Sequence, residues 1–205
     1  MKNLYLLSLI VFITVFISPL NAQVQLGLQA GTNLGDVSLD PTPESVTTGM
    51  RTGIMFGGVL FYSFSPIFGL QVEPAYIQKG ATVDISMTQL EGTITGDYID
   101  IPVLLKASFG DGPVKPYLLA GASIAFLLGD VKLEIDNATE ETLETKSTDF
   151  ILNFGGGVLI PAGQVNIFIE GQYNLGLTDV NDEPEDDMKI KSTGIQIKAG
   201  ALFPL

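Results

Sequence analysis

Apolar and polar residues alternate with a period of two along much of the chain. Val24, Leu26 and Leu28, for example, are separated by glutamine and glycine. Successive side chains of a β-strand point to opposite faces, so this spacing predicts a strand with one apolar face and one polar face. The stretches with clear alternation are residues 24–31, 98–106, 149–160, 164–175 and 194–203.

Three further strands are expected from less regular stretches. Residues 51–64 and 115–127 are apolar on both faces, whereas 69–79 mixes apolar residues with the inward candidates Glu73 and Lys79. The total is eight strands of about ten residues or more, a length that crosses the hydrocarbon of a bilayer when the strand is tilted.

The connections between these strands alternate in length. The short ones are residues 65–68, 109–114 and 161–163. The long ones are residues 34–50, 80–96, 129–148 and 177–192, which exceed the usual loop length of a compact domain. Short periplasmic turns and long extracellular loops are typical of outer-membrane barrels. The sequence therefore predicts an all-β fold: an eight-stranded antiparallel up-and-down transmembrane β-barrel, with both termini periplasmic.

The first residues have the pattern of an export signal. Lys2 gives a basic start, residues 4–17 are almost entirely apolar, and Pro19 to Ala22 form a helix-breaking cleavage region. We expect residues 1–22 to be a signal peptide and 23–205 to be the barrel domain.

Charge is unevenly distributed along the chain. The net charge is −13, from 10 basic and 23 acidic residues, although the mean hydropathy is +0.36. Residues 130–149 hold seven of the acids and residues 179–187 hold six. We expect solvated carboxylates in exposed loops; a shared divalent cation is the alternative, without the spacing of an EF-hand.

The composition excludes several chemistries. The chain has no Cys, His or Trp, so it cannot build a Ser-His-Asp triad, a thiolate or imidazole metal site, or a disulfide. Its acidity opposes binding to nucleic acid, which depends on clustered Lys and Arg. Asp100 and Glu170 could act as an acid and a base, but their spacing does not indicate catalysis. We expect no enzymatic activity, no cofactor and no metal.

Two motifs carry a resemblance to a known family. Residues 98–106 read YIDIPVLLK and residues 115–121 read KPYLLAG. With residues 72–80, they resemble the PorT family of outer-membrane β-barrel proteins of Gram-negative bacteria. The resemblance implies an eight-stranded barrel and an association with type IX secretion. The ending Phe203-Pro204-Leu205 departs from the usual terminal aromatic residue of such barrels.

Several charged residues fall on the polar faces of the expected strands. These inward candidates are Glu73, Lys79, Asp100, Lys106, Glu170 and Lys198, together with Asn166, Gln172 and Asn174. An isolated charge in a narrow interior is costly, so three acids and three bases are expected to pair in a structural network. An eight-stranded barrel is about filled by its side chains, which disfavours a polar conduit.

Two classes of function fit this picture. The first is a non-enzymatic integral outer-membrane protein with a structural, surface-interaction or secretion-associated role. Its expected partners are outer-membrane lipid, the barrel assembly machinery, and surface or secretion-system components. The second is a soluble exported barrel that binds a small apolar ligand, as lipocalins do. The two differ in which face of the barrel is apolar.

Overall fold

The computed structural model describes residues 24–41, 46–85, 90–135, 141–143, 145–179 and 189–205. These residues form one antiparallel sheet of eleven strands. The strands are β1 (Val24–Asp40), β2 (Val46–Ser63), β3 (Phe68–Val72), β4 (Ala75–Ile85), β5 (Leu90–Ser108), β6 (Lys115–Leu127), β7 (Val131–Ile135), β8 (Glu141–Leu143), β9 (Thr148–Ala162), β10 (Val165–Gly176) and β11 (Lys189–Pro204). The expected signal peptide, residues 1–22, lies outside the described residues.

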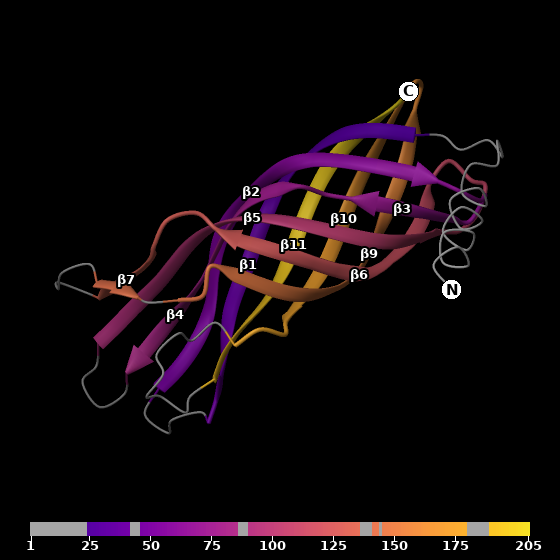
Figure 1. Cartoon of the computed structure of the whole chain (residues 1–205). Helices are drawn as coiled ribbons and strands as arrows, with labels where there is room; N and C mark the ends of the chain where they lie inside the picture. Colours follow the sequence, from indigo (N-terminus) through magenta and orange to yellow (C-terminus); the bar gives the residue numbers. More distant parts are fainter. Residues whose placement is uncertain (1–23, 42–45, 86–89, 136–140, 144, 180–188) are drawn as a thin grey trace, which may run out of the picture.

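The sheet closes on itself into a barrel (Figure 1). The first strand, β1, pairs with both β2 and the last strand, β11. Both β3 and β4 pair with β2 on one side and β5 on the other, so they form a single barrel strand interrupted at Glu73 and Pro74. The ring therefore has eight strands, which confirms the predicted fold. A small hairpin of β7 and β8 lies off the ring, where β7 pairs with β5.

The apolar face of the strands is the outer face. Leu28 is 71% exposed, whereas its neighbour Gln29 is buried. The same division holds on β11, where Ile197 is exposed and both Gln196 and Lys198 are buried. An exterior of this kind is stable only in an apolar medium. A closed barrel can lie in such a medium because its backbone N–H and C=O groups are paired between neighbouring strands. No helix in the described ranges is long and apolar enough to cross a membrane.

Part of the interior is filled by apolar side chains. One buried group near the short turns contains Val59, Leu104, Tyr117, Leu119, Phe168 and Leu202. On β10 and β11, Phe168 and Leu202 lie on the short-turn side of Glu170 and Lys198, and they point to the same inward face. The barrel is therefore packed on the short-turn side of its charged residues.

Three of the predicted long connections are shorter than the sequence indicated. The range 34–50 contains the end of β1 and the start of β2, 80–96 contains the end of β4 and the start of β5, and 177–192 contains the start of β11. Backbone pairing continues along these strands. Several exposed positions there are polar, such as Ser38 and Asp40 on β1 and Asp84 on β4, so the regular apolar alternation that marks the other parts of the strands is lost. The range 129–148 likewise contains the hairpin of β7 and β8.

Candidate functional site in the barrel interior

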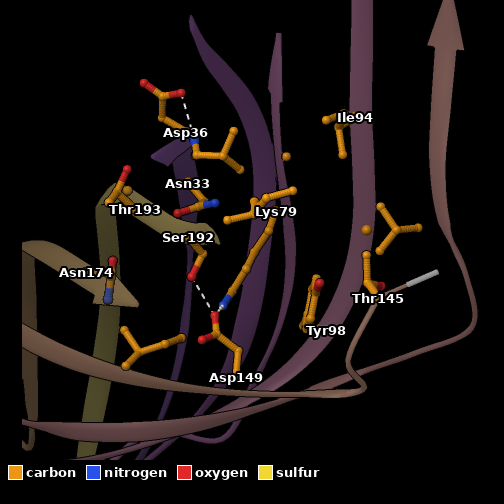
Figure 2. Close-up of a pocket in the computed structure, with 18 of the residues that line it drawn as sticks. Asn33, Asp36, Lys79, Ile94, Tyr98, Thr145, Asp149, Asn174, Ser192 and Thr193 are labelled. Atoms are coloured by element: carbon orange, nitrogen blue, oxygen red, sulfur yellow. Dashed lines mark hydrogen bonds and ion pairs between the residues drawn. The ribbon is translucent and has the colours of Figure 1, made fainter. Parts of the chain in front are cut away.

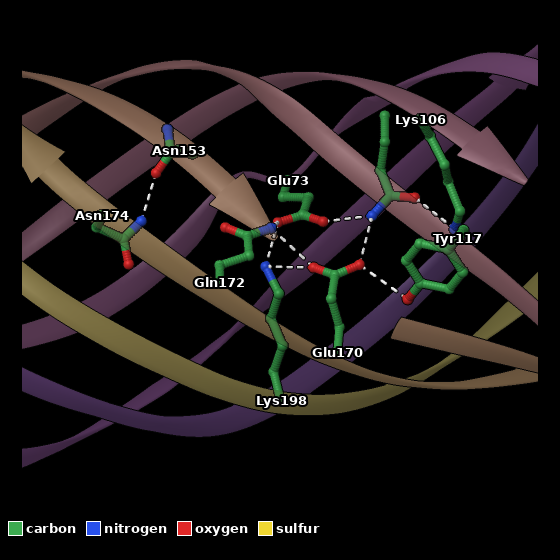
Figure 3. Close-up of polar contacts among 9 residues, drawn as sticks. Glu73, Lys106, Tyr117, Asn153, Glu170, Gln172, Asn174 and Lys198 are labelled. Carbon is green, nitrogen blue, oxygen red and sulfur yellow. Dashed lines mark hydrogen bonds and ion pairs between the residues drawn. The ribbon is translucent and has the colours of Figure 1, made fainter. Parts of the chain in front are cut away.

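Four of the predicted charged residues meet at the centre of the barrel (Figure 3). Glu73 lies at the break between β3 and β4, and Lys106, Glu170 and Lys198 lie on β5, β10 and β11. All four are at most 2% exposed. With Gln71, Tyr117 and Gln172, they form what we call the central cluster.

Lys198 joins the two carboxylates of the central cluster. Its Nζ lies 3.0 Å from Glu170 Oε1 and also donates a hydrogen bond to Glu73 Oε2. Gln172 Nε2 donates to both acids, at 2.7 Å to Glu170 Oε1 and 3.3 Å to Glu73 Oε2. Because carboxylates in a low dielectric are stable only with paired charges and hydrogen bonds, Lys198 is the residue that allows both acids to be buried.

Lys106 is attached to the same cluster through an amide and an aromatic ring. Its Nζ donates to Gln71 Oε1 at 2.9 Å and lies 3.6 Å from the centre of the Tyr117 ring, an arrangement typical of a cation–π contact. Gln71 in turn donates to Glu73 and, at 3.3 Å, to Glu170 Oε2. Two acids and two bases then balance one another within the cluster.

Tyr117 is a member of the cluster that the sequence did not reveal. Its hydroxyl donates to Glu170 Oε2 at 2.9 Å. Residues 115–127 are apolar on both faces, so no polar face singled this tyrosine out. The feature of the sequence that relates to Tyr117 is a glycine on the neighbouring strand. If Gly157 had a side chain, its Cβ would lie 2.6 Å from the Tyr117 hydroxyl oxygen, which is too close. Gly157 therefore leaves the space that the ring occupies.

The other two predicted charges lie away from the central cluster. Lys79 Nζ lies 3.2 Å from Asp149 Oδ2, and the Ser192 hydroxyl donates to the same oxygen. Lys79 also lies 4.9 Å from the centre of the Tyr98 ring. Asp100 is 2% exposed and makes no ion pair in the described part of the chain. Four of the six predicted residues thus lie in the central cluster, whereas Lys79 pairs with Asp149 and Asp100 has no ion-pair partner among the described residues.

The predicted amides are distributed along the barrel in the same way. Gln172 belongs to the central cluster, whereas Asn166 Nδ2 donates to Gln25 Oε1 at 3.3 Å near the short turns. Asn174 Nδ2 donates to Asn153 Oδ1, on the side of the long connections. Polar contacts therefore run along much of the length of the interior.

A cavity of about 100 Å³ lies at the end of the barrel from which the long connections emerge (Figure 2). Its lining comes from β1, β4, β5, β7, β9, β10 and β11, together with Thr145. Lys79 and Asp149 lie in this lining, beside Asn174 and Ser192. We call it the outer cavity. The sequence did not predict it: Asp149 began a predicted strand but was also counted with the loop acids, and Ser192 fell in a predicted loop.

The described residues hold no group of three or more acidic side chains that could bind a metal ion. Much of the acidic sequence, including residues 136–140 and 180–188, lies outside those residues. In the central cluster each carboxylate accepts bonds from Lys198 and from neutral donors. This arrangement neutralises buried charge and holds opposite walls of the barrel together.

Residues 19–182 match the family described as the outer membrane protein beta-barrel domain. The chain belongs to this family. It is accordingly an outer-membrane protein, and its apolar exterior is the surface that faces lipid. The soluble alternative, with an apolar pocket inside, does not fit this family or the polar interior.

Solved structures of outer-membrane proteins have a similar fold. Neisserial surface protein A is 17% identical, with 88% of this chain and 97% of that chain covered and a TM-score of 0.50. OprG from Pseudomonas aeruginosa is 11% identical, with 88% and 95% covered and a TM-score of 0.54. These identities support the shared fold alone. No curated protein sequence matches the chain at a significant level.

Proposed function

We propose that this outer-membrane barrel works without catalysis and without an open channel, as a structural and surface-interaction component of the membrane. The observation that carries the proposal is the position of the central cluster. The strand made of β3 and β4 stands directly opposite β10 in the ring of eight. The hydrogen bonds from Gln71 to Glu170 and from Gln172 to Glu73 therefore cross the full width of the interior.

If the interior is closed, partners can bind only at the outer surface of the barrel, and we propose the end that carries the long connections. The charges of the central cluster neutralise one another, and the apolar group containing Phe168 and Leu202 fills the space on the short-turn side. An eight-stranded barrel has little room beside such side chains. Partners are then expected at the end that carries the long connections, where the chain has most of its acidic residues.

Conductance across a planar bilayer tests this proposal. The wild-type barrel is expected to show no steady ionic current, because the cluster blocks the interior. The double variant Glu73→Ala, Lys198→Ala keeps the interior charge balanced and should allow brief current steps. The variant Lys189→Ala, at the exposed start of β11, is the control and should stay silent. A steady current through the wild type would contradict the proposal.

We also propose that both termini and the short turns face the periplasm. Protease added to intact cells is then expected to cut within residues 129–148 or 177–192 and to spare 65–68 and 161–163. The fragments can be identified by mass spectrometry, with lysed cells as the control in which every exposed connection is accessible. Cuts confined to the short turns of intact cells would reverse the orientation.

A secretion-associated role is the second candidate, and the resemblance to the PorT family favours it. The two PorT-like motifs contribute Lys106 and Tyr117 to the central cluster. This supports a shared barrel interior. Deletion of the gene should lower the amount of type IX cargo in the culture medium, measured against a strain carrying a restored copy. Unchanged cargo secretion would exclude the role.

Two further partners follow from the surface of the barrel. Outer-membrane lipid is proposed to cover the exposed apolar side chains, such as Leu28 and Ile197. The barrel assembly machinery is proposed to recognise β11, which closes the ring against β1 and ends in Phe203 and Pro204.

A further inference from the structure

A groove with a volume of about 460 Å³ lies on the outer face of the barrel and shares no residue with the central cluster or the outer cavity. All eight residues that line it are apolar or glycine; the outward-facing ones are Leu26, Leu28, Gly58, Leu60, Pro74 and Phe203. Building on the proposed function, in which lipid covers the exterior and the short turns face the periplasm, we infer that this groove holds one acyl chain of a glycerophospholipid.

Gly58 forms the floor of the groove. It stands on β2 between Phe56 and Leu60, which are both exposed, so a side chain at this position would point outward. The nearest atoms to a Cβ placed there would be Gly27 O at 3.8 Å and Pro74 Cγ at 4.0 Å. The space outside Gly58 is therefore open, and the outer wall is recessed at this point.

The break between β3 and β4 borders the groove. Glu73 turns inward to Lys198, whereas Pro74, the next residue, is exposed. The carbonyl of Pro74 accepts a hydrogen bond from Gly58 N at 2.9 Å. The wall beneath the groove is therefore closed, and the groove faces the membrane rather than the barrel interior.

The lining of the groove favours a hydrocarbon occupant. An ordered water needs about two to four polar partners, and no lining side chain is polar. An empty groove would leave its walls without van der Waals contacts. By proportion to a cavity of about 150 Å³ that holds benzene, a volume of 460 Å³ corresponds to roughly 18 carbon atoms, the size of one common acyl chain.

The groove is too small to be a stable interface with a second copy of the chain. Such interfaces take about 20 to 30 residues from each partner, whereas eight residues line the groove. A single flexible chain of lipid can fill it without covering the surrounding surface.

The position of the groove along the strands identifies the leaflet. Leu28 is the fifth residue of β1 and Phe203 is the second-last residue of β11, at the ends of these strands that lie with the short turns. With the short turns in the periplasm, the acyl chain comes from the periplasmic leaflet, which consists of glycerophospholipids.

Photochemical labelling in lipid vesicles tests this inference. The full chain is folded in phosphatidylcholine vesicles in which a small part of the lipid carries a diazirine on one acyl chain. Light attaches this lipid to the residues that it contacts, and mass spectrometry identifies them. Leu28 is compared with Leu118, the fourth residue of β6, because the two are 71% and 60% exposed and lie at similar distances from the short-turn ends of their strands. We expect severalfold more label on Leu28.

Two glycine variants separate the groove from general exposure to lipid. Gly58→Leu fills the groove and should lower the labelling of Leu28 to that of Leu118. Gly171→Leu is the matched control: Gly171 is exposed on the outer face of β10, and a Cβ there would have only Gln196 O, at 3.9 Å, within 4 Å. It should leave the ratio unchanged. The wild-type ratio decides the question if Gly58→Leu does not fold.

Equal labelling of Leu28 and Leu118 in the wild type would overturn the inference, and so would an excess at Leu28 that persists in Gly58→Leu. Less label on Leu28 than on Leu118 would show that a protein surface covers the groove, which also overturns it. A lack of label on both leucines would instead contradict the proposed lipid-facing exterior, and the acyl-chain site with it.

Discussion

Replacing Lys198 by methionine is expected to lower the free energy of unfolding by about 3 to 5 kcal/mol, the usual effect of removing one partner from a buried ion pair. The Lys198 side chain is completely buried and contacts both Glu73 and Glu170. Methionine keeps much of the volume but leaves two carboxylates side by side without their shared cation. Urea unfolding in detergent or lipid, followed by circular dichroism or by the mobility of the unheated protein on gels, measures the loss.

The double variant Glu73→Gln, Lys198→Met separates charge from packing. It removes one acid together with the base, and Tyr117 and Gln71 can still bond to Glu170. It should therefore be more stable than Lys198→Met alone. Lys189→Met, at the exposed start of the same strand, is the matched control and should have little effect. A single Lys198→Met variant as stable as this control would show that the central cluster contributes nothing to stability.

Placing arginine at position 197 is the second substitution with a large expected effect. Ile197 is 52% exposed on the outer face of β11, next to the buried Lys198. An arginine near the middle of the bilayer should cost about 2 to 4 kcal/mol, because the cation would stand in hydrocarbon. Urea unfolding of the barrel in lipid vesicles gives this difference directly.

Two controls on β11 separate lipid exposure from other effects. Phe203→Arg, near the end of the strand, should cost about 0 to 1 kcal/mol, because the penalty falls toward the membrane interface. Gln196→Ala changes the buried inner face and should cost less than arginine at 197, because it places no charge in hydrocarbon. Equal costs for arginine at 197 and 203 would contradict the lipid-facing position of Ile197. A wild type that folds as a monomer in buffer without detergent would argue against a membrane-embedded fold.

The sequence predicted the ring and its two faces because alternation records which side of a strand meets lipid. Gln25 and Gln29 are buried and flank Leu26 and Leu28, which are exposed, as period two predicts. The same rule placed Glu73, Lys106, Glu170 and Lys198 inside, where the structure brings them together. Their partners could not be predicted, because pairing across a barrel depends on register and tilt, which a single sequence does not contain.

The residues that the sequence missed share a physical cause. Tyr117 lies on a strand that is apolar on both faces, so its inward position depends on the space left by Gly157. Asp149 lies one residue inside the start of β9, where a run of loop acids obscures the boundary. Parts of β1, β2, β4, β5 and β11 were interpreted as loops because backbone pairing continues there without a regular apolar outer face. Alternation of apolar and polar residues identifies the part of a strand that contacts lipid. Backbone pairing between strands can continue beyond that part.

The length of these strands determines how far the protein stands out from the cell. β5 has 19 residues, of which about 9 to 11 are needed to cross the membrane. At about 3.3 Å per residue and a tilt of about 45°, the remainder rises roughly 20 Å. With the proposed orientation, the paired ends of β1, β2, β4 and β5 form a collar of β-sheet that projects beyond the lipid headgroups on the outer side of the membrane. A large molecule approaching the cell, such as an antibody, would touch this collar before reaching the bilayer.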